Sequence, residues 1–152
     1  MTLLTTNKGT EMIKWKRAVL AGVLGTIGFD LIGMLLNGKW TTPAMLAAKL
    51  GVPFAGGVVA HYSNGILLAI IFAGVGPSLW GQNGMRGLTY MFIQEVFGVW
   101  LFLNPLLGMG IAGVKAGPMT PVISTVKHLA FGLIMAWVYP VATTSSAPAQ
   151  LE

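Results

Sequence analysis

The chain has 152 residues, of which 55% are hydrophobic and only 9% are charged. Soluble domains carry roughly 25% charged residues, so this composition excludes an ordinary water-soluble fold and favours a single domain that lies almost wholly in a lipid bilayer. The formal net charge is +5, but the cations do not gather on one face with aromatic side chains, so nucleic acid is not an expected partner.

Four long apolar stretches follow one another along the chain, and each is close to the ~20 residues that a membrane-spanning helix requires. They predict helices over residues 18–37, 54–75, 87–107 and 120–141. We therefore expect an all-α membrane protein, with four transmembrane helices in an up-down-up-down bundle that occupies residues 18–141.

The two chain ends are expected to lie outside this bundle. Residues 1–17 form an N-terminal segment, and its basic group at 14–17 stands directly before the first apolar stretch. Because cations are retained on the cytoplasmic side of a membrane, this group favours cytoplasmic N and C termini. Residues 142–152 are rich in Ser, Thr, Ala and Pro and predict a disordered tail, whose last two residues are typical of those left by cloning.

The connections on the two sides of the predicted bundle differ in length. Residues 76–87 form a short turn, whereas 38–53 and 106–120 are longer. In the first long connection, Thr42 as N-cap and Pro43 as the first helical residue predict a short interfacial helix. The second is rich in glycine and predicts a loop or a partly re-entrant segment.

The two halves of the chain share one order of residues. In each half an acid is followed by a lysine, a histidine and a glycine, at spacings of 19, 12 and 4 positions and then 20, 13 and 4. This order predicts two tandem helix-hairpin repeats, related by a pseudo-two-fold axis along the membrane normal. The residues are Asp30, Lys49, His61 and Gly65 in the first half, and Glu95, Lys115, His128 and Gly132 in the second.

Each apolar stretch carries one acidic residue or histidine well inside it, and these are Asp30, His61, Glu95 and His128. A charged aspartate at the centre of a membrane helix costs ~2.5–3.5 kcal/mol on insertion scales, so such residues are candidates for a functional site. In a sequential bundle the second and fourth helices are diagonal. We therefore expect the two histidines to oppose each other across the bundle axis, and the two acids to oppose each other on the second diagonal.

Two imidazoles and two carboxylates suit a transition metal such as Fe, Zn or Mn. The leading prediction is a metal or metallo-cofactor site with His61 and His128 as ligands, and with Asp30 and Glu95 as further ligands or as groups that orient the imidazoles. A variant is haem b, held axially by the two histidines, with the glycine one turn after each histidine leaving room for the porphyrin.

Other functions stay open on the sequence. The same residues would suit a proton or metal-ion path, and small size would suit a homo-oligomer or a subunit of a larger membrane complex. The acids could also bond one histidine each and merely hold helices together. Cysteine is absent and no nucleophile arrangement stands out, so no catalytic residue is predicted. Asn64, Asn104 and Ser124 should add polar lining, and Lys127 is expected to reach the membrane interface.

Four motifs that contain these polar residues carry a resemblance, and they are Gly25-Thr-Ile-Gly-Phe-Asp30-Leu, His61-Tyr-Ser-Asn-Gly65, Asn104-Pro-Leu-Leu-Gly-Met-Gly-Ile-Ala112 and His128-Leu-Ala-Phe-Gly132-Leu. Together they span most of the chain and resemble a family of small four-helix bacterial integral membrane proteins of unknown function. The resemblance implies the topology and a bacterial inner membrane, but no activity. In that family Gln usually precedes the third-helix proline, where this chain has Asn104, and Glu95 matches no fixed acid.

Overall fold

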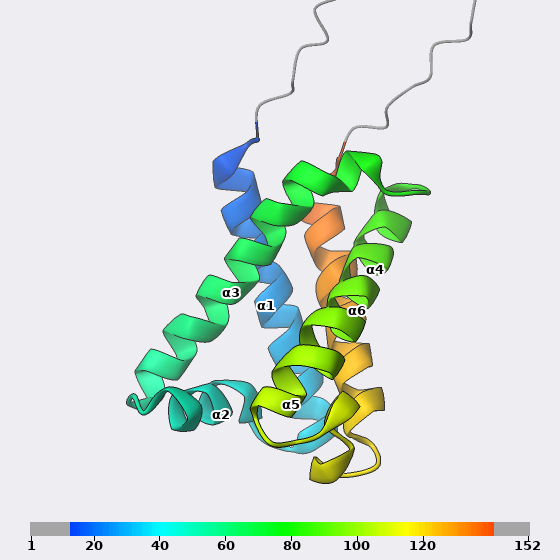
Figure 1. Cartoon of the computed structure of the whole chain (residues 1–152). Coiled ribbons are helices and arrows are strands. Elements are labelled where there is room, and N and C mark those ends of the chain that lie inside the picture. The colour runs from blue at the N-terminus through cyan, green and yellow to red at the C-terminus, as the bar shows by residue number, and fades with distance from the viewer. Residues whose placement is uncertain (1–12, 142–152) are drawn as a thin grey trace, which may run out of the picture.

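The fold is known from a computed structural model that describes residues 13–141. The expected tail at 142–152 and the first part of the expected N-terminal segment, residues 1–12, lie outside the described residues. All regular structure in the described part is helical, as the composition predicts (Figure 1).

Three described helices are long and apolar enough to cross a membrane: α1 (Trp15–Asn37), α3 (Phe54–Val75, continued to Ser78) and α6 (Thr120–Val138). Less than half of each span is buried inside the protein. Large apolar side chains therefore face outward, among them Leu35 at 80% exposure and Trp137 at 79%. Such a surface suits lipid and not water, so the prediction of a membrane protein is confirmed at this level.

The third expected span, at 87–107, falls in a helical stretch that begins earlier and changes its winding. Helix α4 (Asn83–Gln94) runs directly into the π-helix η2 (Glu95–Leu103), which runs directly into α5 (Asn104–Leu106). π-Helices are rare and frequently mark functional sites. This one starts at the acid that the sequence singles out.

The connecting segments contain the remaining helices. Helix α2 (Thr41–Leu50) lies in the first long connection, the short 3-10 helix η1 (Gly76–Ser78) follows α3, and the 3-10 helix η3 (Ile111–Ala116) lies in the second long connection. Helix α2 begins at Thr41, and no side chain caps it. The hydroxyl of Thr42 instead accepts a hydrogen bond from α6, which is described below.

The long helices pack in the spatial order α3, α1, α6, α4, because α1 contacts both α3 and α6, and α6 contacts α4. Helices α3 and α4 meet near η1, where the Tyr90 hydroxyl donates a hydrogen bond of 3.0 Å to the carbonyl of Leu68 and the Tyr90 ring packs on Phe72. From there they diverge toward α2 (Figure 1). Helices α3 and η2 therefore make few direct contacts with each other.

Glycines set the crossings of α1 with α3 and of α4 with α6. A Cβ atom on Gly22 of α1 would lie 2.5 Å from the Cα of Ile66 in α3, and a Cβ on Gly65 would overlap the Thr26 hydroxyl. A Cβ on Gly132 of α6 would lie 2.5 Å from the carbonyl oxygen of Gly87 in α4. Small residues allow membrane helices to approach this closely.

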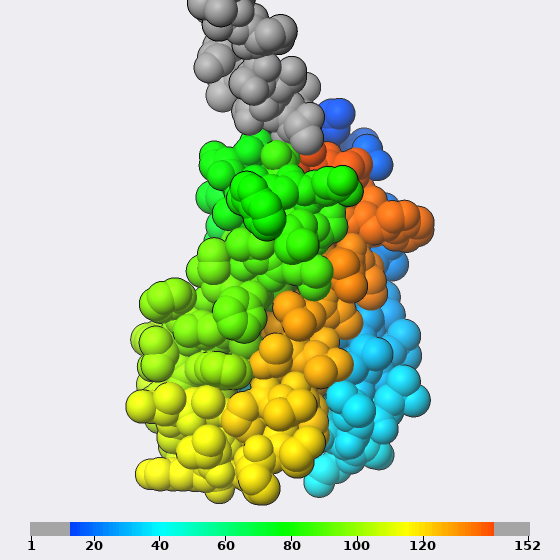
Figure 2. Space-filling view, turned by 90° about the vertical axis from the view of Figure 1, so that its right-hand side faces the viewer, coloured from blue at the N-terminus to red at the C-terminus, as the bar shows by residue number. Residues whose placement is uncertain are grey.

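Both ends of the described chain lie at the η1 end of the bundle. The backbone N–H of Lys14 donates to the Tyr139 hydroxyl at 3.2 Å, and Arg17 Nε donates to the carbonyl of Val138 at 2.7 Å. Figure 2 shows the start of α1 and the end of α6 together at this end, while the second long connection lies at the other. Helix α2 and η3 therefore lie at the end of the bundle opposite to the ends of the described chain (Figure 1).

Candidate functional site

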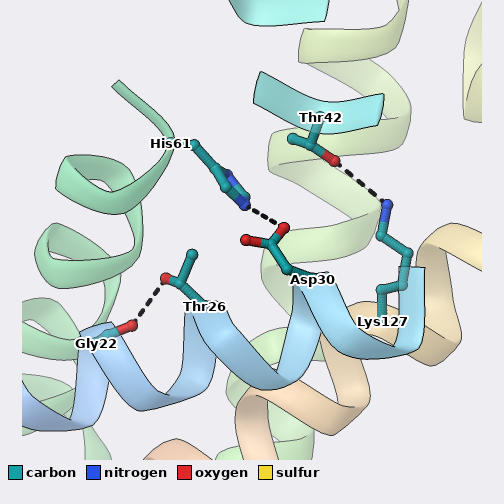
Figure 3. A network of polar contacts seen from close by, with 6 residues as sticks. All are labelled: Gly22, Thr26, Asp30, Thr42, His61 and Lys127. Atoms are coloured by element: carbon teal, nitrogen blue, oxygen red, sulfur yellow. Dashed lines mark hydrogen bonds and ion pairs between the residues drawn. The ribbon is translucent and has the colours of Figure 1, made fainter. Parts of the chain in front are cut away.

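The first ionisable pair joins α1 to α3. The Nε2 atom of His61 lies 2.9 Å from Oδ1 of Asp30, and both residues are buried (Figure 3). Thr26, one turn earlier on the same face of α1, donates its hydroxyl to the carbonyl of Gly22 and is thereby satisfied within its own helix. With an ionised Asp30, Nε2 of His61 is the donor, and Nδ1 is the second ring nitrogen.

The second pair joins η2 to α6. The Nδ1 atom of His128 lies 2.7 Å from Oε2 of Glu95 and 2.8 Å from the carbonyl oxygen of Ser124. A carbonyl can only accept a hydrogen bond, so Nδ1 carries a proton and Nε2 is the second ring nitrogen of His128. Glu95 is fully buried, at 0% exposure.

Phe29 connects the two pairs. Its ring centroid lies 5.3 Å from that of His61 and 4.9 Å from that of His128, and Lys127 Nζ stands 4.2 Å from the same centroid. The histidines were expected to oppose each other across the bundle. In the structure they pack against one shared aromatic ring of α1. His61 is hydrogen-bonded to Asp30, whereas His128 makes an ion-pair contact with Glu95 and gives its hydrogen bond to Ser124.

A cavity of about 450 Å³ lies in front of the imidazoles. It is bounded by α1, α3, α6, the α4–η2 stretch and, at the long-loop end, α2 and the segment before η3. Its polar lining comprises Thr26, Asn37, Thr41, Thr42, His61, Asn64, Gln94, Asn104, Thr120, Ser124, Lys127 and His128.

All three predicted supporting residues, Asn64, Asn104 and Ser124, line this cavity. Asp30 and Glu95 do not line it and stand behind the imidazoles, whereas both imidazoles face it. The acids are therefore placed to orient the histidines and to balance their charge, and not to touch a ligand in the cavity directly. Carboxylates behind histidines commonly fix the ring orientation and tautomer in this way.

Two amides offer unused hydrogen-bonding atoms in the cavity wall. Among the described residues, neither Oε1 of Gln94 nor Nδ2 of Asn104 has a hydrogen-bond partner, although both atoms are buried. Buried polar groups are normally paired, so these atoms are places where a bound molecule could complete the bonding.

Lys127 is a site residue that sequence reasoning missed. It is buried at 8% exposure, with its stem against Gly33, and its expected reach to the membrane interface stays a prediction. Its Nζ atom donates to the Thr42 hydroxyl at 3.4 Å (Figure 3). The signal that could have found it is helical spacing, because Ser124, Lys127 and Phe131 lie three or four positions apart and share one face of α6.

The ligand set for a metal is incomplete within residues 13–141, where no group of three or more His, Cys, Asp and Glu side chains could hold a metal ion. A haem site has less support than a metal site. The Nε2 atom of His61 is already bonded to Asp30, so only Nδ1 could bind the haem iron, and Nδ1 lies beside Cβ and the helix backbone. Gly65 and Gly132, which were expected to make room for a porphyrin, are in contact with neighbouring helices. The Fe, Zn or Mn site and the haem b site stay predictions.

Comparison with known proteins adds no relative, since no family model, curated protein or solved structure matches this chain. The class of protein that the fold and the site define is a helical membrane protein with paired imidazoles and carboxylates at an internal cavity. The resemblance to a four-helix bacterial family stays a prediction.

Proposed function

We propose that this chain is a small proton-coupled transporter of the bacterial inner membrane, in which the two imidazole–carboxylate pairs bind and release the coupling proton. The observation that carries the proposal is that both buried pairs stand against one cavity and share Phe29 and Lys127 as neighbours. Ionisable groups inside membrane segments characteristically mark proton and ion paths.

The net charge of the site supports the exchange of a single proton. With both imidazoles neutral, Asp30 and Glu95 contribute two negative charges and Lys127 contributes one positive charge, so the site has a net charge of −1. The phenol of Tyr62, which packs beside His61 at 5.8 Å between ring centroids, is neutral. An unbalanced buried charge is costly, so the site favours one added positive charge, which a proton on an imidazole supplies.

The proposal includes a fourth membrane crossing. Helices α4, η2 and α5 follow each other without a gap and contain 12, 9 and 3 residues, 24 in all. This exceeds the ~20 residues that a spanning helix needs. We infer that the stretch crosses the bilayer beside α6 and completes an up-down-up-down bundle, with the termini in the cytoplasm.

The helix contacts support the tandem repeat. Each half of the chain holds one glycine crossing and one acid–histidine pair, and the glycine of the first helix precedes the acid by eight positions in both halves. In both halves the histidine precedes its own helix's crossing glycine by four positions. The equivalent residues are Gly22, Asp30, His61 and Gly65, followed by Gly87, Glu95, His128 and Gly132.

The test is nuclear magnetic resonance of ¹⁵N-histidine-labelled protein in nanodiscs, purified with a histidine-free tag, because the chain contains only two histidines. As the pH is lowered from 8 to 5, we expect one imidazole per chain to become cationic. Thr125→Val is the control, since the Thr125 hydroxyl donates to the carbonyl of Pro121 within α6 and does not line the cavity. If both rings stay neutral while the protein stays folded, the proposal is wrong.

A second candidate function is transition-metal binding, which the position of the acids behind the imidazoles favours. It predicts about one Zn²⁺ bound per chain in detergent, with at least tenfold weaker binding after His61→Ala or His128→Ala. Isothermal titration calorimetry and metal analysis measure this. Equal binding by wild type and both variants would assign the metal to another part of the chain.

A further inference from the structure

We infer that the substrate exchanged for the proton is a lipophilic organic monocation that enters the cavity sideways from the bilayer. This inference rests on the proposed function and names its substrate class. It is carried by the position of the cavity mouth, by the chemistry of the cavity walls and by the net charge of the site.

The mouth of the cavity lies between two helices and not at a water-facing loop. Among its described lining residues only Asn64 of α3 and Phe102 of η2 are exposed. These two helices diverge from the contact of Phe72 with Tyr90 near η1 (Figure 1), make few direct contacts with each other, and hold the two exposed lining residues on either side of the space between them. In a membrane this space faces lipid, so the accessible solutes are those that partition into the bilayer.

The walls suit an organic molecule better than a hydrated ion. The volume of about 450 Å³ lies within the range of about 300–1,000 Å³ that is typical of small-molecule sites. Beyond the polar groups the lining is apolar and aromatic, with Phe29, Phe102 and Phe131 among its members. A hard inorganic cation such as Ca²⁺ takes ~6–8 oxygen ligands, whereas aromatic rings stabilise an organic cation through their faces.

The charge selects a cation and fixes the stoichiometry. The titratable groups around the site are Asp30 of α1, His61 and Tyr62 of α3, Glu95 of η2, and Lys127 with His128 of α6. The cavity residues of α2 are not titratable. When a monocation enters, one imidazolium returns its proton to water. One positive charge enters and one leaves, so the site stays neutral.

Lys127 orients the bound cation. Its ammonium group is held at the α2 end of the cavity by Thr42 and by the face of Phe29. Like charges repel more strongly in a low-dielectric interior. The organic cation is therefore placed toward the opposite end, where Met91 and Phe131 form the wall and Gln94 offers an unpaired amide oxygen.

The experiment compares tetraphenylphosphonium with tetraphenylborate, which has the same shape and the opposite charge. In detergent-solubilised full-length protein we expect the cation to bind and the anion not to bind, by isothermal titration calorimetry. In weakly buffered solution about one proton should be released per cation bound, as read by a pH indicator. Because one proton competes, the apparent affinity should fall up to tenfold per pH unit on acidification.

A pair of matched variants tests the location. Val99→Trp fills the cavity from η2 and should weaken tetraphenylphosphonium binding at least tenfold, while the imidazole that becomes cationic in wild type still does so. Val122→Trp makes the same substitution at an exposed position of α6 outside the cavity and should bind as wild type does. Equal affinities of the two variants would overturn the assignment to this cavity.

The outcomes of these experiments distinguish a wrong substrate class from a wrong proposed function. If an imidazole changes charge but tetraphenylphosphonium does not bind, or if tetraphenylborate binds equally well, the substrate class is wrong and proton exchange stands. If tetraphenylphosphonium binds without proton release and neither imidazole changes charge, cation binding is not coupled to a proton. The proposed function is then wrong as well.

Discussion

Asp30 and Glu95 contact the imidazoles on the side away from the cavity. They therefore act on the histidines and do not bind a ligand in the cavity directly. An ionised acid bonded to a histidine stabilises the cationic form of the ring and fixes its orientation. Helix-helix hydrogen bonds in membranes are worth only about 0.6 kcal/mol on average. The two pairs therefore contribute little to the free energy of unfolding. Their main contribution is the negative charge that they place beside the cavity.

Asp30→Asn separates these two contributions, because the amide keeps an acceptor for His61 and removes the negative charge. We expect the net charge of the site with neutral imidazoles to rise from −1 to 0, so that proton uptake is lost, while the unfolding free energy falls by only about 1 kcal/mol. Histidine NMR and thermal unfolding in detergent measure the two effects. An unchanged proton uptake would contradict the charge argument.

Lys127→Met makes the opposite change and lowers the net charge of the site from −1 to −2. Both imidazoles should then become cationic on acidification, and histidine NMR should show two charged rings instead of one. Lys49→Met is the matched control, since Lys49 is an exposed residue of α2 outside the cavity. A spectrum of Lys127→Met identical to that of wild type would place Lys127 outside the charge balance.

Individual site residues differ in how far sequence could predict them. The sequence shows four of them directly, because an ionisable group inside an apolar stretch is costly in a membrane. These are Asp30, His61, Glu95 and His128. Lys127 is not evident, since a long cationic side chain can either reach the interface or fold inward, and the groove at Gly33 that holds its stem exists only after α1 and α6 have packed.

At the scale of helices, the glycine crossings determine how closely the elements approach. Gly132→Ala should destabilise the protein by about 1–3 kcal/mol, because the added methyl group meets the carbonyl of Gly87 in α4. Gly74→Ala is the control in α3, where an added Cβ has no atom within 4 Å. There alanine should be neutral or stabilise by about 0.5–1 kcal/mol. Reversible unfolding in mixed detergent micelles compares the two, and equal effects would contradict the contact.

Helix boundaries were predictable only where residues such as Pro and Gly border an apolar segment. The segment at 54–75 is bordered by Pro and Gly, and α3 occupies the same residues. In the third segment the sequence continues from α4 into η2 without a proline, so nothing in its pattern marks the change of winding. The π-helix at Glu95–Leu103 therefore could not be predicted from the sequence, nor could the early start of α4.

At the scale of the whole molecule, the ends of the described chain and the long connections lie at opposite ends of the bundle (Figure 1), which makes the orientation testable. The chain has no native cysteine, so single substitutions can report sidedness. If the termini are cytoplasmic, Lys49→Cys in α2 should react in intact cells with a membrane-impermeant thiol reagent. Trp80→Cys, at the η1 end, should react only after permeabilisation. The reverse pattern would invert the proposed orientation.

Composition was enough to predict a helical membrane protein, because it depends on the average chemistry of the chain. The divergence of α3 and η2 was not predictable, since it depends on which helix pairs hold close contacts and which do not. Glycines join α1 to α3 and α4 to α6, whereas α3 meets α4 through the bulky rings of Phe72 and Tyr90 near η1.

The residues that directly precede the two acids and the two histidines make the site unequal in charge. Phe29 and Gln94 each precede an acid, Ala60 and Lys127 each precede a histidine, and all four line the cavity. A perfectly symmetric pair of halves would contribute fixed charges in even numbers. The single lysine makes the total odd, so the site cannot reach neutrality by itself and must carry an odd number of mobile positive charges. Under the proposed function, the site is therefore neutral only while it holds a mobile positive charge, which is either a proton or the bound cation.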